Sequence, residues 1–398
     1  LAYRPRSSDG VDSQAATEPP LPEDVGSLDE LYLTGLHLAQ YRHATRTPER
    51  YWREALRRDP ADSRCNTAMG EWHLRRGELA DAVRHLRQAI ATLTKRNPNP
   101  RDGEPLYLLG VALRHLDEHD AAYDAFYKAT WNAAWQSPAH FALAMHDCRR
   151  RQWAKALGHL DRALRVNADH LQARDLKAIV LRRLGRDAEA TSLLEATVAL
   201  NPTAYLARQL LGRSPTFDAQ VHLDLAWDLW HAGLADEAIA LLKQVRADDA
   251  SGAAPLVAYT LAAFHEWGGK NDEAAIARQA AKGAPWQYCF PARLQEIAVL
   301  RAAIAADAAD PRAPFYLGCL LYDRGRYDEA IACWERSAAA DADFAPVWRC
   351  LGMAAFNVRH DTQAALDAYE RAVAAAPDGG RLLYERDQLW KRLGVAPE

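Results

Sequence analysis

Several features that would mark common functional classes are missing from this chain of 398 residues. No apolar run approaches the roughly 20 residues that a membrane-spanning helix needs. The formal net charge is only −4, which gives no electrostatic basis for binding nucleic acid or an anionic membrane surface. The six cysteines show no paired spacing, so we expect buried, reduced thiols and a cytoplasmic location.

Recognisable catalytic motifs are also lacking. The sequence contains no glycine-rich phosphate loop, no nucleophile elbow and no paired-cysteine metal site. His115 and His119 have the four-residue spacing that can hold a metal, but they flank a predicted turn and have no third ligand nearby in the sequence. We therefore expect these two histidines to be solvated, and we expect no catalytic residue, no metal and no cofactor.

A pattern of small residues recurs along almost the whole chain. A small residue is followed by alanine 12 residues later and by another small residue 7 residues beyond that. Copies with this spacing or one extra residue begin at Gly35, Gly70, Gly110, Ala144, Ala178, Ala226, Ala262, Gly318 and Gly352. Such spacing is typical of two antiparallel helices whose backbones touch where the side chains are smallest, and neighbouring pairs must stack to bury their apolar faces.

The repeat resembles the tetratricopeptide repeat. Copies at 110, 144 and 178 follow one another by 34 residues, which is the period of that family. Most second helices carry a bulky residue at one position, and Arg278 breaks this pattern. Prolines at 60, 202 and 377 end second helices. The bulky residues are Trp52, Leu86, Phe126, Leu160, Leu194, Leu242, Trp334 and Tyr369. The resemblance implies an all-α fold, a right-handed superhelical solenoid of antiparallel helix pairs.

The regular spacing is interrupted in ways that predict the organisation of the chain. Residues 1–27 are rich in Pro, Ser, Asp and Glu and predict a disordered linker, which implies further polypeptide before it. A loop is expected at 94–105, a truncated unit around Gly212, and a lone helix at about 292–306. These interruptions divide the repeats into an N-terminal block, 28–212, and a C-terminal block, 213–398.

The C-terminal block is expected to end in a capping helix at 381–393. Its apolar residues form one stripe, and a solenoid needs such a helix to shield its last apolar face. We expect Trp390 to pack around Tyr369.

A second resemblance concerns three runs, at 31–38, 123–136 and 288–293. They are similar to the C-terminal repeat region of large bacterial proteins that carry a β-rich domain of unknown function before their repeats. That upstream domain is similar to galactose-mutarotase-like sandwiches, which handle carbohydrates. The resemblance implies a sugar-related context, but no residue of such a domain lies in this chain.

Resemblance to the repeat family also implies which residues face the concave groove, namely positions five, nine, twelve and thirteen of each first helix. The resulting binding candidates are Arg75, Tyr107, Arg114, Phe141, Arg149, Arg182, Trp227 and Trp230, and the same rule gives Tyr259, Trp267, Phe315 and Tyr322. Trp131 and Trp135 lie beyond the closing mark of their repeat, so we add this indole pair as candidates for stacking on a sugar or gripping a peptide.

Two functions remain open from the sequence. The first is a non-catalytic interaction scaffold that binds a protein or peptide, or the upstream domain of its own chain. The alternative is an accessory repeat region of a carbohydrate-active enzyme, which walls the substrate cleft of the upstream domain. Exposure of both Trp131 and Trp135 would favour the carbohydrate alternative, and burial of both would favour the scaffold.

Overall fold

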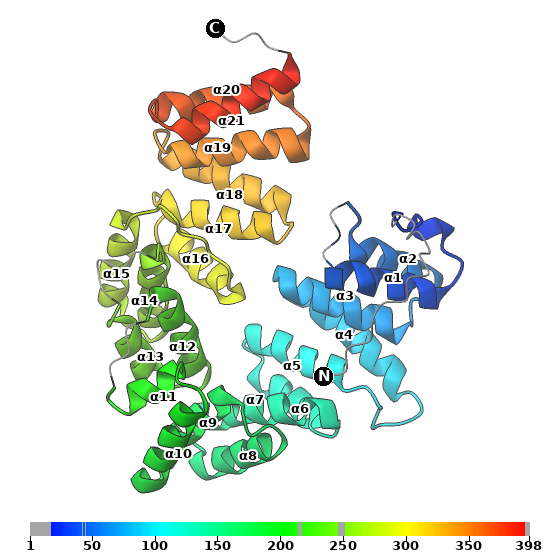
Figure 1. The fold of residues 1–398 in the computed structure, drawn as a ribbon, viewed down its shortest axis with the longest axis vertical. Coiled ribbons are helices and arrows are strands. Elements are labelled where there is room, and N and C mark those ends of the chain that lie inside the picture. The colour runs from blue at the N-terminus through cyan, green and yellow to red at the C-terminus, as the bar shows by residue number, and fades with distance from the viewer. Residues whose placement is uncertain (1–16, 42, 44, 214–216, 246–250, 395–398) are drawn as a thin grey trace, which may run out of the picture.

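The computed structural model describes residues 17–41, 43, 45–213, 217–245 and 251–394, and within these ranges the regular secondary structure is helical throughout (Figure 1). Most helices form antiparallel pairs of neighbours in the sequence. The pairs are α1 (Leu28–Tyr41) with α2 (Pro48–Arg58), α3 (Ser63–Arg76) with α4 (Leu79–Thr94), α5 (Glu104–His115) with α6 (His119–Ala129), α7 (Gln136–Arg149) with α8 (Trp153–Val166), α9 (Leu171–Arg183) with α10 (Asp187–Leu200), α12 (Ala219–His231) with α13 (Ala235–Leu242), α14 (Ala254–Trp267) with α15 (Asn271–Gly283), α17 (Arg312–Asp323) with α18 (Tyr327–Ala340), and α19 (Ala345–Ala354) with α20 (Thr362–Ala375). The predicted all-α solenoid is confirmed.

Within each pair, the helices meet where the sequence places its smallest residues. A Cβ atom on Gly318 would lie 2.4 Å from Nε1 of Trp334 and 3.0 Å from the carbonyl oxygen of Ala330. Gly110 meets Phe126 in the same way, at 2.6 Å. Ala122 and Ala330 each lie 12 residues after their glycine, and both are fully buried. The small residues therefore set the crossing point, as the spacing predicts.

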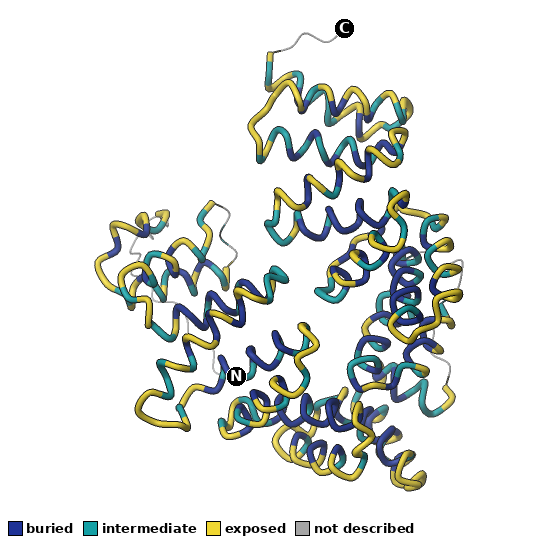
Figure 2. Tube along the Cα trace, turned by 180° about the vertical axis from the view of Figure 1, so that it is seen from behind, coloured by how far each residue is buried: buried dark blue, intermediate teal, exposed yellow. Residues whose placement is uncertain are grey.

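First helices lie on the inside of the solenoid and second helices on the outside. The inner α7 is buried along most of its length, whereas the outer α15 buries only Ala274 and Ala281 (Figure 2). Inner helices are covered on two sides by neighbouring repeats, so their remaining side chains form the concave surface.

The irregular units are those that the sequence predicts. A loop joins Thr94 at the end of α4 to Glu104 at the start of α5. The truncated unit is the six-residue α11 (Tyr205–Leu210), and the lone helix is α16 (Leu294–Ala306), which packs against α14 and α17. The largest hydrophobic cluster contains both Leu206 and Leu223, so the core continues across the predicted boundary between the two blocks.

The solenoid curls far enough for distant repeats to touch. The Arg326 guanidinium, in the α17–α18 turn, donates hydrogen bonds to the carbonyl oxygens of Arg76 (3.1 Å) and Gly77 (3.3 Å). Cδ1 of Ile297, on α16, lies 2.7 Å from where a Cβ atom on Gly77 would stand. Figure 1 shows the end of α3 facing α16 across the middle of the molecule. The α3–α4 turn thus closes the curl against α16 and α18.

The start of the described chain differs from the expected linker. Residues 17–27 include a short 3₁₀ turn, η1 (Pro22–Asp24), and Val25 is buried. The Arg58 guanidinium donates to the carbonyl oxygen of Val25 at 2.6 Å, and the Tyr51 hydroxyl donates to that of Pro20 at 2.7 Å. Long-range hydrogen bonds from α2 therefore order a segment whose composition alone would not. Residues 1–16 of the expected linker lie outside the described residues.

The last helix, α21 (Gly380–Leu393), lies on α20 as the expected cap would, but through a different residue. Leu389, and not Trp390, packs with Tyr369 and Ala365 in a buried cluster. The Trp390 ring lies half-buried under the Arg386 guanidinium at 4.3 Å. Adjacent helical residues point about 100° apart, so Leu389 and its neighbour cannot both face α20.

Candidate functional site

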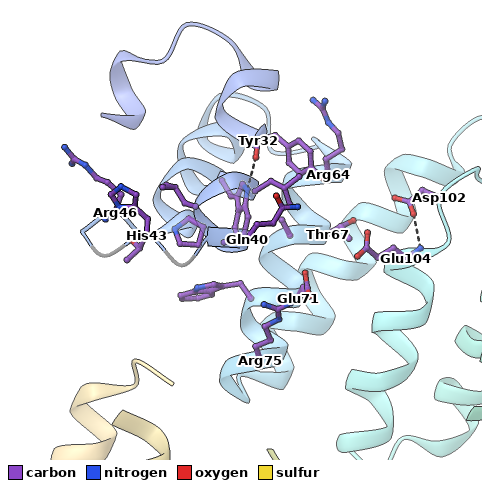
Figure 3. Close-up of a pocket in the computed structure, with 18 residues that line it drawn as sticks. Tyr32, Gln40, His43, Arg46, Arg64, Thr67, Glu71, Arg75, Asp102 and Glu104 are labelled. Atoms are coloured by element: carbon purple, nitrogen blue, oxygen red, sulfur yellow. Dashed lines mark hydrogen bonds and ion pairs between the residues drawn. The ribbon is translucent and has the colours of Figure 1, made fainter. Parts of the chain in front are cut away.

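The N-terminal hollow is a cavity of about 540 Å³ on the concave side of α1, α3 and the start of α5 (Figure 3). Its wall includes the aromatic residues Tyr32, Trp52 and Trp72. The Trp52 indole is fixed by a 3.4 Å hydrogen bond to the carbonyl oxygen of Tyr32. Trp72 carries the Arg76 guanidinium over its ring at 4.2 Å. Each of the two indoles in this wall is therefore held by a contact with a neighbouring residue, Trp52 by Tyr32 and Trp72 by Arg76.

Charged side chains of both signs line the N-terminal hollow. Figure 3 shows His43 and Arg46 on one side and Asp102 and Glu104 on the other, with Glu71 in between. Burial raises the pKa of Glu104, and the carboxylates of Asp102 and Glu71 raise it further. No cation pairs with Asp102 or Glu104 among the residues that the structure describes. This side of the hollow is therefore an acidic surface without a counter-charge.

Of the candidates from the sequence, Arg75 belongs to this hollow, where its guanidinium forms a short ion pair with Glu71 (2.5 Å) on the next turn of α3. Five others come together at a second cavity of about 470 Å³, namely Arg114, Arg149, Trp227, Trp230 and Trp267. This central hollow lies between the ends of α5, α7, α12, α14 and α16. The sequence placed these residues on the inner surface, and the structure brings them to one place.

The remaining candidates lie apart from both hollows. Tyr107 stacks on Trp135 with ring centroids 4.8 Å apart, and Trp135 is half-buried. Trp131 is 54% exposed, and the Lys128 ammonium lies 3.8 Å from its ring centroid. Because one indole is packed and the other is exposed, the pair forms no common stacking platform.

Two further candidates have structural partners. The ring centroid of Phe141 lies 4.8 Å from that of His170. The Arg182 guanidinium donates a hydrogen bond to the carbonyl oxygen of Leu210 at 2.8 Å. Tyr259 is fully buried and donates to Asp310 at 2.7 Å, and Phe315 is also buried. The positional rule is wrong for Tyr259 and Phe315. Tyr259 is covered by the segment after α16 that carries Asp310, and Phe315 packs against Phe344 just before α19, with ring centroids 4.9 Å apart.

The expectation that His115 and His119 are solvated is wrong. Both line the central hollow together with His146 and His231. Burial lowers the pKa of His115 to about 4, and its ring meets that of His231 at a centroid distance of 6.3 Å. The superhelical curl brings α12 over the end of α5, which no local pattern indicates. A signal did exist, since His115 and His231 occupy the thirteenth position of their helices, which the groove rule includes.

In the described ranges the six cysteines are free thiols, and none of them is fully exposed. The free cysteines Cys65, Cys148, Cys289 and Cys350 are buried, and Cys319 and Cys333 are partly buried. Burial raises the pKa of Cys65 to about 12. Across the residues that are described, no group of three or more His, Cys, Asp or Glu side chains could hold a metal ion. None of the described helices has both the length and the apolar composition that crossing a bilayer requires.

Comparison with known proteins identifies the family. The tetratricopeptide repeat model matches residues 67–138, 141–205, 297–346 and 315–380, more than half of the chain, so the chain belongs to the tetratricopeptide repeat family. A tetratricopeptide repeat protein from Parabacteroides merdae is 16% identical, with a TM-score of 0.43 over 70% of this chain and 98% of that chain. YrrB, described as a TPR protein with an unusual peptide-binding site, is 15% identical, with a TM-score of 0.39 over 47% of this chain and 92% of that chain. PilF from Pseudomonas aeruginosa is 18% identical, with a TM-score of 0.39 over 55% of this chain and 89% of that chain.

Proposed function

We propose that this chain is a non-catalytic interaction scaffold that holds a protein or peptide segment on its concave surface. The observation that carries the proposal is the N-terminal hollow, which lies on the inner helices and has the unpaired carboxylates of Asp102 and Glu104 in its wall. Its volume of about 540 Å³ suits a few side chains of an extended segment. Another protein, or another domain of the same polypeptide, would supply such a segment.

The chemistry of the hollow favours a segment with a cationic side chain. Asp102 and Glu104 repel each other's charge, as the raised pKa of Glu104 reflects. A lysine or arginine side chain between them would replace this repulsion with attraction. At the opposite side, Arg46 already pairs with Glu18 at 3.0 Å, so that side offers less to an acidic group.

The carbohydrate alternative has less support. It rested on Trp131 and Trp135 as an exposed pair, and Trp135 is packed on Tyr107. A single exposed indole that already carries a lysine ammonium is a poor platform for a sugar ring.

The proposal is tested by selecting random peptides displayed on phage against the purified full chain. We expect the enriched peptides to share a lysine or arginine. Their affinity, measured by isothermal titration calorimetry, should fall about tenfold or more in Glu104→Lys, because the new charge repels the peptide. Glu335→Lys, a matched change on the exposed face of α18, should bind as the unmodified chain does.

Two results would contradict the proposal. One is a selection that enriches no peptide at all. The other is a set of enriched peptides that bind Glu104→Lys and the unmodified chain equally well.

A further inference from the structure

The central hollow is built as a small-molecule site, separate from the N-terminal hollow. Its volume of about 470 Å³ lies within the range that small-ligand pockets occupy. Three indoles, those of Trp227, Trp230 and Trp267, line one part of it. Two guanidiniums and four imidazoles line most of the rest, together with Asp117, Gln295 and Ala298. The cavity therefore combines flat aromatic surface with cationic and hydrogen-bonding groups.

Polar atoms in this wall lack partners although they are buried. Nε1 of Trp227 and Nε2 of His146 accept or donate no hydrogen bond within the described ranges, and these side chains are only 5% and 4% exposed. The same holds for Nε of Arg114 and Nδ1 of His119. Unpaired buried polar atoms are rare in folded proteins because nothing compensates their lost hydration. A ligand in the central hollow would supply the missing partners.

The wall carries a positive charge that no carboxylate of the described chain neutralises by direct contact. Neither Arg114 nor Arg149 forms an ion pair of 4.0 Å or less there. Burial lowers the pKa of Arg114, so the environment disfavours its charge. Asp117 also lines the hollow, but its side chain is 89% exposed and lies 3.7 Å from His119.

The imidazoles add hydrogen-bonding capacity without adding charge. Burial lowers the pKa of His115 to about 4 and that of His146 to about 3, and it also lowers the pKa values of His119 and His231. The rings are therefore neutral near pH 7, and each offers one donor and one acceptor. A buried guanidinium beside neutral imidazoles favours an anionic ligand.

The aromatic part of the wall is rigid and still partly open. Trp230 stacks on Phe264 with ring centroids 4.1 Å apart and an angle of 6° between the rings. Trp267 lies 5.7 Å from Trp230 and is 43% exposed. Rings held in this way lose little freedom when a flat ligand packs against them.

Contacts between repeats fix the walls relative to one another. Arg293, just before α16, donates to Asp224 at 2.6 Å and to the carbonyl oxygen of Gln220 at 2.9 Å, both on α12. Ile297 on the same helix contacts Gly77 across the curl. The hollow is thus held in shape without a ligand.

We propose that the central hollow binds a small organic anion that carries a planar aromatic ring. The carboxylate or phosphate of the ligand pairs with Arg114, assisted by Arg149 and by Nε1 of Trp227, and its ring packs against the indoles. This site is independent of the proposed peptide binding, since it uses none of the residues of the N-terminal hollow.

The test is isothermal titration calorimetry of the full chain with phenylacetate and with phenyl phosphate. Benzyl alcohol serves as the neutral analogue, and acetate and inorganic phosphate serve as anions without a ring. We expect saturable one-to-one binding of at least one aromatic anion, about tenfold or more tighter than the alcohol or the ringless anions. The better of the two aromatic anions identifies the preferred charged group.

Variants assign the binding to this cavity. Arg114→Met keeps an unbranched apolar stem and removes the charge. Trp227→Phe removes the indole N–H. Each change should weaken binding about tenfold. Arg149→Met provides a second charge variant if Arg114→Met melts at a lower temperature than the unmodified chain. Arg165→Met, at an exposed position on α8, should leave binding unchanged.

The proposal is overturned if neither aromatic anion binds saturably at millimolar concentration. It is also overturned if benzyl alcohol binds as tightly as the anions, or if both Arg114→Met and Arg149→Met bind as the unmodified chain does.

Discussion

Asp175 on α9 is expected to make the stability of this solenoid depend on pH. Its side chain is only 5% exposed, and its Oδ1 atom has no hydrogen-bond partner in the described part of the chain. It lines a narrow cavity together with Asp228 of α12 and with apolar residues such as Leu206. Burial, assisted by the charge of Asp228, raises the pKa of Asp175 to about 7.

The raised pKa of Asp175 determines how the stability of the fold changes with pH. A carboxyl group whose pKa is raised by folding is more stable in the native state when it is protonated. Its contribution is fully present below the ordinary pKa of 3.8, and it is lost as the pH rises through about 7. The unmodified chain should therefore be less stable at about pH 8 than at about pH 5, by the part of this contribution that is lost between the two pH values.

Asp175→Asn removes the titration and keeps the shape of the side chain. About three pKa units correspond to up to about 4 kcal/mol at alkaline pH, and to much less at acidic pH. We expect the melting temperature of the variant to exceed that of the unmodified chain by several degrees at about pH 8, with the difference shrinking at about pH 5. Far-ultraviolet circular dichroism melts at both pH values measure this.

Asp169→Asn, at an exposed loop position before α9, is the matched control and should shift the melting temperature at neither pH. The reasoning is refuted if Asp175→Asn has the same effect at both pH values, or if it lowers the melting temperature at about pH 8. Either result would mean that Asp175 is ionised at neutral pH and hydrogen-bonded in a way that stabilises the fold.

Two further predictions concern packing. Gly318→Ala should destabilise the chain by about 1 to 3 kcal/mol, because the new methyl group would lie 2.4 Å from an indole atom of Trp334. The control Gly158→Ala adds a methyl group with no atom within 4 Å and should be neutral or stabilising. Equal melting temperatures of the two variants would mean that the helix crossing is not where we place it. Leu389→Ala should lower the free energy of unfolding by roughly 2 kcal/mol or more, because it opens the cluster around Tyr369. Trp390→Ala should lower it by less, and chemical denaturation measures both. The reverse order would show that the face of α21 has been assigned wrongly.

The sequence alone determined the helix pairs, their register and the interruptions between them. Gly318, Ala330 and Trp334 meet across a single turn, so a pattern within about twenty residues contains all the information about their contact. The same holds for the loop after Thr94 and for the lone α16, where prolines and glycines interrupt the pattern. Because the first helices face inward, the repeat position also placed Arg114 and Trp227 on the inner surface.

Only the tertiary structure decided which inner residues share a site. The curl of a solenoid is the sum of small rotations between successive repeats, and no local pattern records that sum. Arg326 therefore reaches Gly77 from 249 residues away. His115 contacts the ring of His231 and is only partly exposed, although the sequence pattern leaves its turn open to solvent. In the same way, the irregular α16 unit buries Tyr259, which a regular repeat would have left in the groove. Local spacing fixes contacts between neighbouring helices, whereas contacts across the curl depend on the geometry of every repeat in between.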